Sequence, residues 1–190
     1  MQTHVTADSV LAGPNYTLAP ITDADITDKY LGWLNDPEVN RYLEVRFTPQ
    51  TRETALAYVR SFYRDEEKYM WTIRPNGRPE PVGSITLAFF NRTHQTAEIG
   101  LMIGNRDYWG RGASTEALGL ICEFAFERIG LRRLVAGSYA PNRGMNFTFK
   151  QLGFRIEGRL VQAFFLEPDS YVDGVRWGLL RDEWKANRKS

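Results

Sequence analysis

Residues 107–118 read DYWGRGASTEAL, in which two glycines stand one residue apart directly before a helix-like run. The preceding residues 96–104, TAEIGLMIG, show the alternation typical of a strand, so the glycines form a turn from strand to helix. Such a turn directs several backbone N–H groups and the positive helix end toward one point, as a diphosphate requires. Gly110 and Gly112 would let the ligand's oxygens approach the backbone. The alternative is a helix that happens to begin with glycines.

Two better-known phosphate-binding turns do not fit this segment. A Walker-type loop has four residues between its glycines, followed by Lys and then Ser or Thr. Here five residues separate Gly104 from Gly110, and Arg111 is followed by another glycine. The dinucleotide fingerprint needs a third glycine and an acidic residue about twenty residues further on, whereas no acidic residue lies between Glu127 and Glu157.

The composition indicates one globular domain. The chain has 190 residues, of which 43% are hydrophobic and 25% charged, enough to bury one core. The 24 Lys and Arg nearly balance the 23 Asp and Glu, so no long-range field favours nucleic acid or an anionic membrane as a partner. Residues 1–13 lack the features of a signal peptide or anchor. We expect a cytoplasmic protein with a loose leader at 1–13 and a single domain at 14–190.

The cysteine and histidine content argues against a disulfide and a metal site. Cys122 is the one cysteine, which excludes an internal disulfide and suits a reducing compartment. It falls near the buried side of a helix, where we expect a small core residue rather than a nucleophile. With two histidines no metal cluster is expected.

The hydrophobic periodicity changes along the chain from mostly helical to mostly strand-like. We expect strands at residues 15–22, 69–75, 82–91, 96–104, 131–140, 155–165 and 171–180, and helices at 23–36, after a cap at Thr48 or Thr51, at 114–130 and at 141–154. This order predicts an α/β fold of the mixed α+β type. Its sheet would be mostly antiparallel, with about seven strands and with helices on both faces.

Four segments together resemble a known family. YWGRGASTEAL (108–118) resembles the acetyl-CoA binding signature of the GNAT N-acetyltransferase superfamily, most closely that of its RimJ/RimL-like branch. The resemblance extends to WLNDPEVNRYL (33–43), AEIGLMIG (97–104) and NRGMNFTFKQLGFRIEG (142–158). Four motifs in the right order are far more specific than one glycine pair. The resemblance implies a GNAT fold whose sheet splays between its fourth and fifth strands, and an enzyme that uses acetyl-CoA and needs no metal.

The resemblance also implies which residues contact the cofactor. Backbone N–H groups of residues 110–114 would bind the pyrophosphate, and the pantetheine arm would lie along the strand before the turn. The broad signature has Gln or Arg where this chain has Trp109, but the branch usually has Tyr-Trp-Gly. The implied cofactor residues are Leu101, Met102, Ile103, Trp109, Gly110, Arg111, Gly112, Ala113, Ser114, Asn142 and Phe149.

Glu98 is the candidate general base. Glu98, Gly100 and Met102 share one face of their strand, so Gly100 removes a side chain beside the carboxylate. The position resembles the one from which several relatives recruit a base. Our hypothesis is that Glu98, through water, takes a proton from the acceptor ammonium. The alternative is a carboxylate that is solvated or paired with an arginine.

The family's usual proton donors are missing from this sequence. Phe149 stands where many GNAT enzymes have a tyrosine, and Met145 where a serine is common. Tyr139 is a candidate substitute, although strand-end tyrosines usually serve packing. A thiolate can also leave without an enzymic acid because its pKa is low. A CoA-binding module that has lost turnover therefore remains an alternative to an enzyme.

The segment 40–51 is the candidate acceptor site, since in this superfamily it overhangs the acceptor. Arg46 would bind an acidic group such as a nucleotide diphosphate, with Tyr42 or Phe47 stacking on a ring. The alternative is a surface arginine beside two core aromatics. We expect a small primary amine as acceptor, for example a nucleotide-linked amino sugar, with a protein N-terminus as the alternative.

The last strands carry large aromatic residues. These residues are Tyr171, Trp177 and Trp184, and we expect them to be core or dimer contacts. A homodimer formed through these strands is compatible with the sequence.

Overall fold

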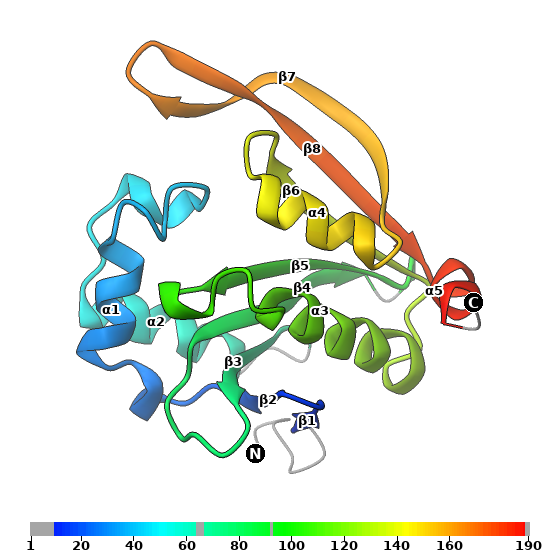
Figure 1. Cartoon of the computed structure of the whole chain (residues 1–190), viewed down its shortest axis with the longest axis horizontal. Helices are drawn as coiled ribbons and strands as arrows, with labels where there is room; N and C mark the ends of the chain where they lie inside the picture. Colours follow the sequence, from blue (N-terminus) through cyan, green and yellow to red (C-terminus); the bar gives the residue numbers. More distant parts are fainter. Residues whose placement is uncertain (1–9, 64–66, 92, 189–190) are drawn as a thin grey trace.

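The computed structural model describes residues 10–63, 67–91 and 93–188. Within these residues one mixed sheet of eight strands runs in the order β1-β2-β3-β4-β5-β6-β8-β7 (Figure 1). All neighbouring strands are antiparallel except β5 and β6, which are parallel. The strands are β1 (Leu11–Ala12), β2 (Tyr16–Pro20), β3 (Tyr69–Pro75), β4 (Gly83–Asn91), β5 (Thr96–Ile103), β6 (Arg133–Tyr139), β7 (Arg155–Glu167) and β8 (Ser170–Leu180).

Helices cover both faces of this sheet, as the sequence predicts. They are α1 (Asp28–Asn35), α2 (Arg52–Tyr63), α3 (Ala113–Glu123), α4 (Arg143–Gln151) and α5 (Arg181–Asn187). A π-helical turn, Phe124–Arg128, continues α3, and short 3₁₀ turns lie at Asp23–Asp25, Glu44–Phe47 and Arg106–Tyr108. The predicted mixed architecture, a mostly antiparallel sheet with helices on both faces, is confirmed.

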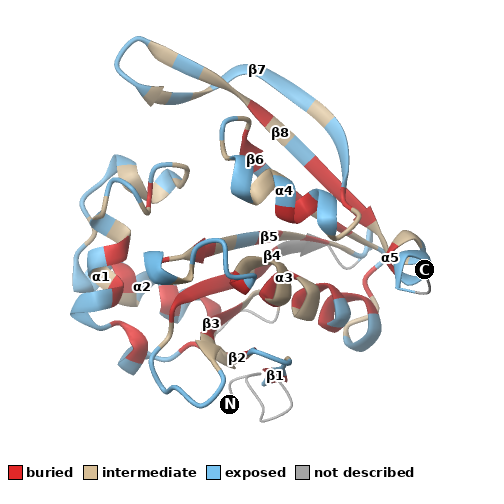
Figure 2. Cartoon of the chain, viewed as in Figure 1, coloured by how far each residue is buried: buried red, intermediate tan, exposed pale blue. Residues whose placement is uncertain are grey.

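Two hydrophobic clusters lie on the two faces, because alternate residues of a strand point to opposite sides. The larger cluster joins α3 and α4 to residues such as Ile99 of β5 and Leu134 of β6. The smaller cluster joins α1 and α2 to Met102 of β5. Figure 2 shows the buried residues concentrated in the sheet centre and α3, whereas most of β7 is exposed.

Three expectations need correction. The sheet has an eighth strand because Leu11 and Ala12, inside the predicted leader, pair with Leu18 and Thr17 of β2; residues 1–9 of that leader lie outside the described residues. Trp184 lies not in a strand but in α5, where its ring packs 6.3 Å from that of Phe126. The predicted helix 114–130 is α-helical only to residue 123 and continues as the π-helical turn.

The sheet splays between β5 and β6, which are the fourth and fifth of the predicted strands, as the resemblance implies. Only three residue pairs join these strands, the last being Glu98 with Val135. Beyond Glu98, residues 100–103 of β5 remain paired with β4 but have no strand partner on the other side. The backbone at this end of β5 is therefore open to another molecule.

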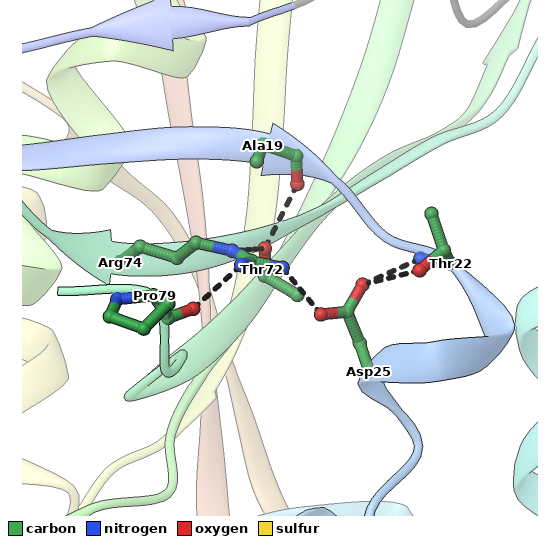
Figure 3. Close-up of polar contacts among 6 residues, drawn as sticks. All are labelled: Ala19, Thr22, Asp25, Thr72, Arg74 and Pro79. Carbon is green, nitrogen blue, oxygen red and sulfur yellow. Dashed lines mark hydrogen bonds and ion pairs between the residues drawn. The ribbon is translucent and has the colours of Figure 1, made fainter.

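A polar network anchors the turn before α1 to the sheet (Figure 3). Asp25 is 7% exposed, and its Oδ2 accepts hydrogen bonds from the backbone N and Oγ1 of Thr22 at 2.8 and 2.9 Å. The guanidinium of Arg74 pairs with Oδ1 of Asp25 and also donates to Oγ1 of Thr72 and the carbonyl of Pro79. Arg74 thus compensates the buried negative charge.

Replacing Arg74 by methionine is expected to lower the free energy of unfolding by about 1–3 kcal/mol, because Asp25 would stay buried without its cation. Urea denaturation would measure the loss. The double variant Asp25→Leu/Arg74→Met should be more stable than Arg74→Met alone, since the unpaired charge is removed. A double variant that is less stable than Arg74→Met would contradict this reading of the network.

Candidate active site

The glycine turn between β5 and α3 has the backbone conformation that only glycine adopts easily. Gly110 and Gly112 have φ angles of +70° and +79°. A Cβ built on either residue would meet no atom within 4 Å, so the space beside the backbone is open. Gly112 caps α3, and its carbonyl accepts from the N–H of Glu116 at 2.9 Å. The N–H groups before Glu116 therefore have no helical partner.

Hydrogen bonds to the end of β5 and to the start of β2 hold this turn in place. The indole Nε1 of Trp109 donates to the carbonyl of Ile103 at 2.8 Å, and the hydroxyl of Tyr16 donates to the carbonyl of Arg111 at 3.4 Å. Oε1 of Glu116 accepts from the backbone N–H of Asn15 and Tyr16, both at 2.8 Å. Glu116 thereby ties the first turn of α3 to the start of β2.

The start of α4 forms the opposite wall. Asn142 caps the helix, with its Oδ1 accepting from the N–H of Met145 at 3.2 Å. Asn146 donates from Nδ2 to the carbonyls of Tyr139 and Ala140 at 3.2 and 3.0 Å. Its Oδ1 accepts from the hydroxyl of Ser138 at 2.6 Å. These bonds fix α4 to the end of β6, on the far side of the splay.

A cavity of about 1030 Å³ lies between the two walls, at the upper end of the usual range for ligand pockets. It is bounded by the glycine turn, the end of β5, the start of α4 and the segment 38–43. α3 and α4 belong to one face of the sheet, whereas Leu43 packs with α1 and α2 on the other. The cavity therefore runs through the splay from one face to the other.

Most of the predicted cofactor residues line this cavity, namely Leu101, Met102, Ile103, Trp109, Gly110, Gly112, Ser114 and Asn142. Arg111 and Ala113 do not; the N–H of Arg111 donates to the carbonyl of Tyr108 at 3.4 Å, and the side chain of Ala113 is buried in the core. Phe149 does not line it either. Its ring is 3% exposed and packs against Phe154 and Trp177, so its predicted contact with the cofactor has no support here.

Arg41 and Leu43, within the predicted acceptor segment 40–51, and Met145, at the family's serine position, also line the cavity. Sequence reasoning missed the remaining lining residues: Glu38, Val39, Thr115, Glu116, Arg143, Gly144, Phe147, Thr148 and Gln151. A signal for part of this group was present. Gly144, Thr148 and Gln151 follow one another at helical spacing, so they share a face of α4. Phe147 is 65% exposed although it is large and apolar, which suits a surface that a ligand covers.

Glu98 is paired with an arginine, one of the alternatives that the sequence left open. Its Oε1 lies 3.0 Å from Nη1 of Arg176 on β8. Glu98 is not among the lining residues but stands at the last pair between β5 and β6, next to the opening of the splay. A proton transfer from the cavity to Glu98 would therefore need an intervening water.

The hydroxyl and the ring of Tyr139 make their contacts outside the cavity. Its hydroxyl donates to Oε1 of Glu44 at 2.8 Å, and its ring stacks on Phe164 with centroids 4.4 Å apart. Burial raises the pKa of Tyr139, and the hydrogen bond to Glu44 raises it further. The side chain does not line the cavity, so the structure favours packing and anchoring over proton donation.

The three predicted acceptor residues do not lie together: one lines the cavity and two contact β7. Tyr42 lines the cavity, and its ring lies 5.7 Å from that of Tyr139. Arg46 instead donates to the carbonyl of Leu166 at 2.8 Å and to that of Phe165. Phe47 packs on Phe165 with ring centroids 6.2 Å apart. Because these carbonyls occupy the guanidinium, the predicted binding of an acidic acceptor by Arg46 has no support in this arrangement.

Arg46, Phe47 and Glu44 together form a contact that we term the 44–47 clamp. It joins the 3₁₀ turn after the segment 38–43 to the ends of β6 and β7. In Figure 1 this turn faces the β7–β8 hairpin from the side of α1. The clamp thus connects the two sides of the splay near the segment 38–43.

Within residues 10–63, 67–91 and 93–188, no three His, Cys, Asp or Glu side chains gather as a metal site would require. No helix of the described chain has the length and apolar character needed to span a membrane.

Comparison with known proteins gives consistent matches. A family model described as an acetyltransferase (GNAT) domain matches residues 15–155. The chain is 27% identical over 169 residues to the uncharacterized N-acetyltransferase YoaA of Bacillus subtilis (strain 168), covering 87% of this chain and 94% of that protein. It is 25% identical over 126 residues to the spermidine N(1)-acetyltransferase of Escherichia coli (strain K12), covering 66% of each.

A solved structure matches in fold. It is that of RimL, an alpha-N-protein acetyltransferase in complex with coenzyme A. The TM-score is 0.78 at 16% identity, and the match covers 92% of this chain and 99% of that chain. At this identity the likeness shows the fold alone.

Proposed function

Because the chain belongs to the GNAT acetyltransferase family, we propose that it transfers the acetyl group of acetyl-CoA to the primary amine of a small molecule. The transfer is direct, with both substrates bound together. The observation that carries the proposal is the continuous cavity from the glycine turn, past the unpaired end of β5, to the segment 38–43. One substrate enters on each face of the sheet.

The residues around the glycine turn fit coenzyme A. The open space at the Cβ positions of Gly110 and Gly112 admits phosphate oxygens to the backbone, and the free N–H groups and helix dipole at the start of α3 favour an anion. The backbone of residues 100–103, which has no strand partner on the β6 side, suits the amides of pantetheine. Acetyl-CoA supplies the thioester carbonyl, which a backbone N–H near Met102 would polarise.

In the proposed reaction Glu98 accepts a proton, through a water molecule, from the acceptor ammonium. The neutral amine nitrogen then forms a bond to the acetyl carbon, and the carbon–sulfur bond breaks with its electron pair leaving on the sulfur. The nitrogen gives up its second proton to solvent water, so that a neutral amide and a thiolate result. The cavity residues act mainly by holding the reacting atoms together. The thiolate needs no proton donor to leave because its pKa is low, in keeping with Phe149 and Tyr139 lying outside the lining.

A small acceptor is favoured by the 44–47 clamp, because a bridge across the splay restricts the room for an extended peptide. The similarity to a spermidine acetyltransferase points the same way. A nucleotide-linked amino sugar loses support, since Arg46 is occupied by backbone carbonyls. A protein N-terminus stays the alternative acceptor, in line with the fold shared with RimL.

The proposal is tested by following thiol release from acetyl-CoA with a panel of acceptors. The panel includes polyamines, amino sugars with and without a nucleotide, and short peptides with free N-termini. We expect release stimulated by one class of small amine and not by the others. Stimulation by peptides alone would replace the small-amine acceptor by the protein N-terminus.

A CoA-binding module without turnover is the second candidate, favoured by the apolar Phe149 and Met145 at the family's proton-donor positions. The same panel separates the two. CoA binding by calorimetry without acceptor-stimulated thiol release from any amine would support the module and overturn the enzyme.

Replacing Gly112 by alanine is expected to weaken the binding of CoA about tenfold. A residue with a side chain loses roughly 1–2 kcal/mol in the left-handed conformation, so the turn shifts and its N–H groups turn from the diphosphate. The matched control is Gly119→Ala within α3, where a Cβ would meet only Leu152 at 3.9 Å. Calorimetry with CoA should find the control unchanged; equal affinities for both variants would contradict the role of the turn.

A further inference from the structure

The ion pair of Glu98 and Arg176 spans three strands. Arg176 lies on β8 and Glu98 on β5, with β6 between them. On β6, Val135 stands opposite Glu98, and Gly137, two residues further toward the splay, stands opposite Arg176. With 3.0 Å between Nη1 and Oε1, the arginine side chain crosses over β6 to reach the carboxylate.

Gly137 keeps the path of this arginine open. A Cβ at Gly137 would lie 3.7 Å from Nη1 of Arg176, and it would meet no other atom within 4 Å. An alanine would thus make ordinary contact with the guanidinium. A branched side chain would occupy the space that the guanidinium fills. The absence of a side chain at this one position of β6 is what permits a contact between β5 and β8.

Only one of the two carboxylate oxygens of Glu98 takes part in the contact with Arg176. Oε1 of Glu98 accepts from Nη1 of Arg176, and no described residue provides a hydrogen bond to Oε2. The two side chains are 37% and 45% exposed, so the pair adds little to stability. Its main effect is to restrict where the carboxylate stands, at the residue where β5 leaves β6.

We propose that Arg176 is a positioning residue for acetyl transfer, holding Oε1 of Glu98 from across Gly137 so that Oε2 is presented to the acceptor through water. This inference rests on the proposed function, in which Glu98 is the base. Without Arg176 the carboxylate would rotate among several rotamers, and fewer of them would be productive. The loss would appear in turnover rather than in the binding of either substrate.

A double-mutant cycle tests this role. Arg176→Gln is expected to lower kcat about tenfold, with little change in the KM for acetyl-CoA or in thermal stability. Arg176→Lys should restore part of the loss, since an ammonium can also bind Oε1. In the Glu98→Gln background, Arg176→Gln should cause no further loss, because Arg176 acts only through the carboxylate.

Two more variants separate positioning from a general effect on the hairpin. Arg155→Gln removes an ion pair of β7, the other strand of the hairpin, namely that with Glu183 at 3.0 Å, and should leave kcat unchanged. Gly137→Val should lower kcat to about the level of Arg176→Gln, whereas Gly137→Ala should not. A Gly137→Val variant with wild-type turnover would overturn the proposed path.

The outcomes distinguish a failure of this inference from a failure of the proposed function on which it rests. If Glu98→Gln lowers kcat and Arg176→Gln does not, the positioning role is wrong while Glu98 remains the base. If the losses in the double variant multiply, Arg176 acts independently of Glu98 and the inference fails. If no acceptor stimulates thiol release by the wild type, the proposed function itself fails.

Discussion

Glu98→Gln is expected to lower kcat about a hundredfold, the usual contribution of a positioned general base. The amide is of nearly the same size, and its oxygen can still accept from Arg176, so the geometry of the contact at 3.0 Å is kept while the proton acceptor is lost. The KM for acetyl-CoA should change little, because Glu98 does not line the cavity. Steady-state kinetics across a range of pH measures both constants.

The matched control for this variant is Glu123→Gln. Glu123 lies on α3 and forms an exposed pair with Arg188 at 3.1 Å, so its replacement removes a carboxylate and an ion pair away from the site. It should turn over like the wild type. If Glu98→Gln matched the wild type at every pH, Glu98 would not be the base and another proton acceptor would have to be sought.

Trp177→Ala is expected to produce the largest loss of stability, about 3–5 kcal/mol. Trp177 is 1% exposed, its ring lies 5.5 Å from that of Phe149, and its Nε1 donates to the hydroxyl of Ser138 at 2.9 Å. The substitution leaves a cavity between β8 and α4. Urea or thermal denaturation should show the loss.

Trp177→Phe separates packing from hydrogen bonding at this position. It keeps an aromatic ring but removes the donor to Ser138, so we expect a smaller loss, about 1–2 kcal/mol. If Trp177→Ala were no more destabilised than Trp177→Phe, the ring's packing would contribute little, and the assignment of Trp177 to the core would be wrong.

The sheet and the glycine turn could be predicted because their signals are local. Strands alternate in hydrophobicity and end at turns, and the turn carries two glycines at positions that both proved to have positive φ. α5 escaped prediction because it has seven residues, too few for helical periodicity to emerge. β1, with two residues, left no pattern at all.

The contacts of the site could not be predicted in the same way. Arg46 binds backbone carbonyls 119 and 120 residues away. Because every residue has a backbone carbonyl, the residue types do not indicate which carbonyls an arginine binds. Glu116 binds N–H groups 100 and 101 residues away. For Glu98 the sequence allowed an arginine partner but did not identify Arg176, 78 residues distant, because that choice depends on the strand order.

The short seam between β5 and β6 divides the sheet into a five-strand part and a three-strand part that share only three residue pairs. Main-chain cohesion along this line is therefore weak. A ligand seated between the glycine turn and α4 touches both parts, so its binding free energy also holds the protein's halves together and adds to resistance against unfolding. A bound substrate of this protein would therefore stabilise the arrangement of the two sheet parts relative to each other until it dissociates.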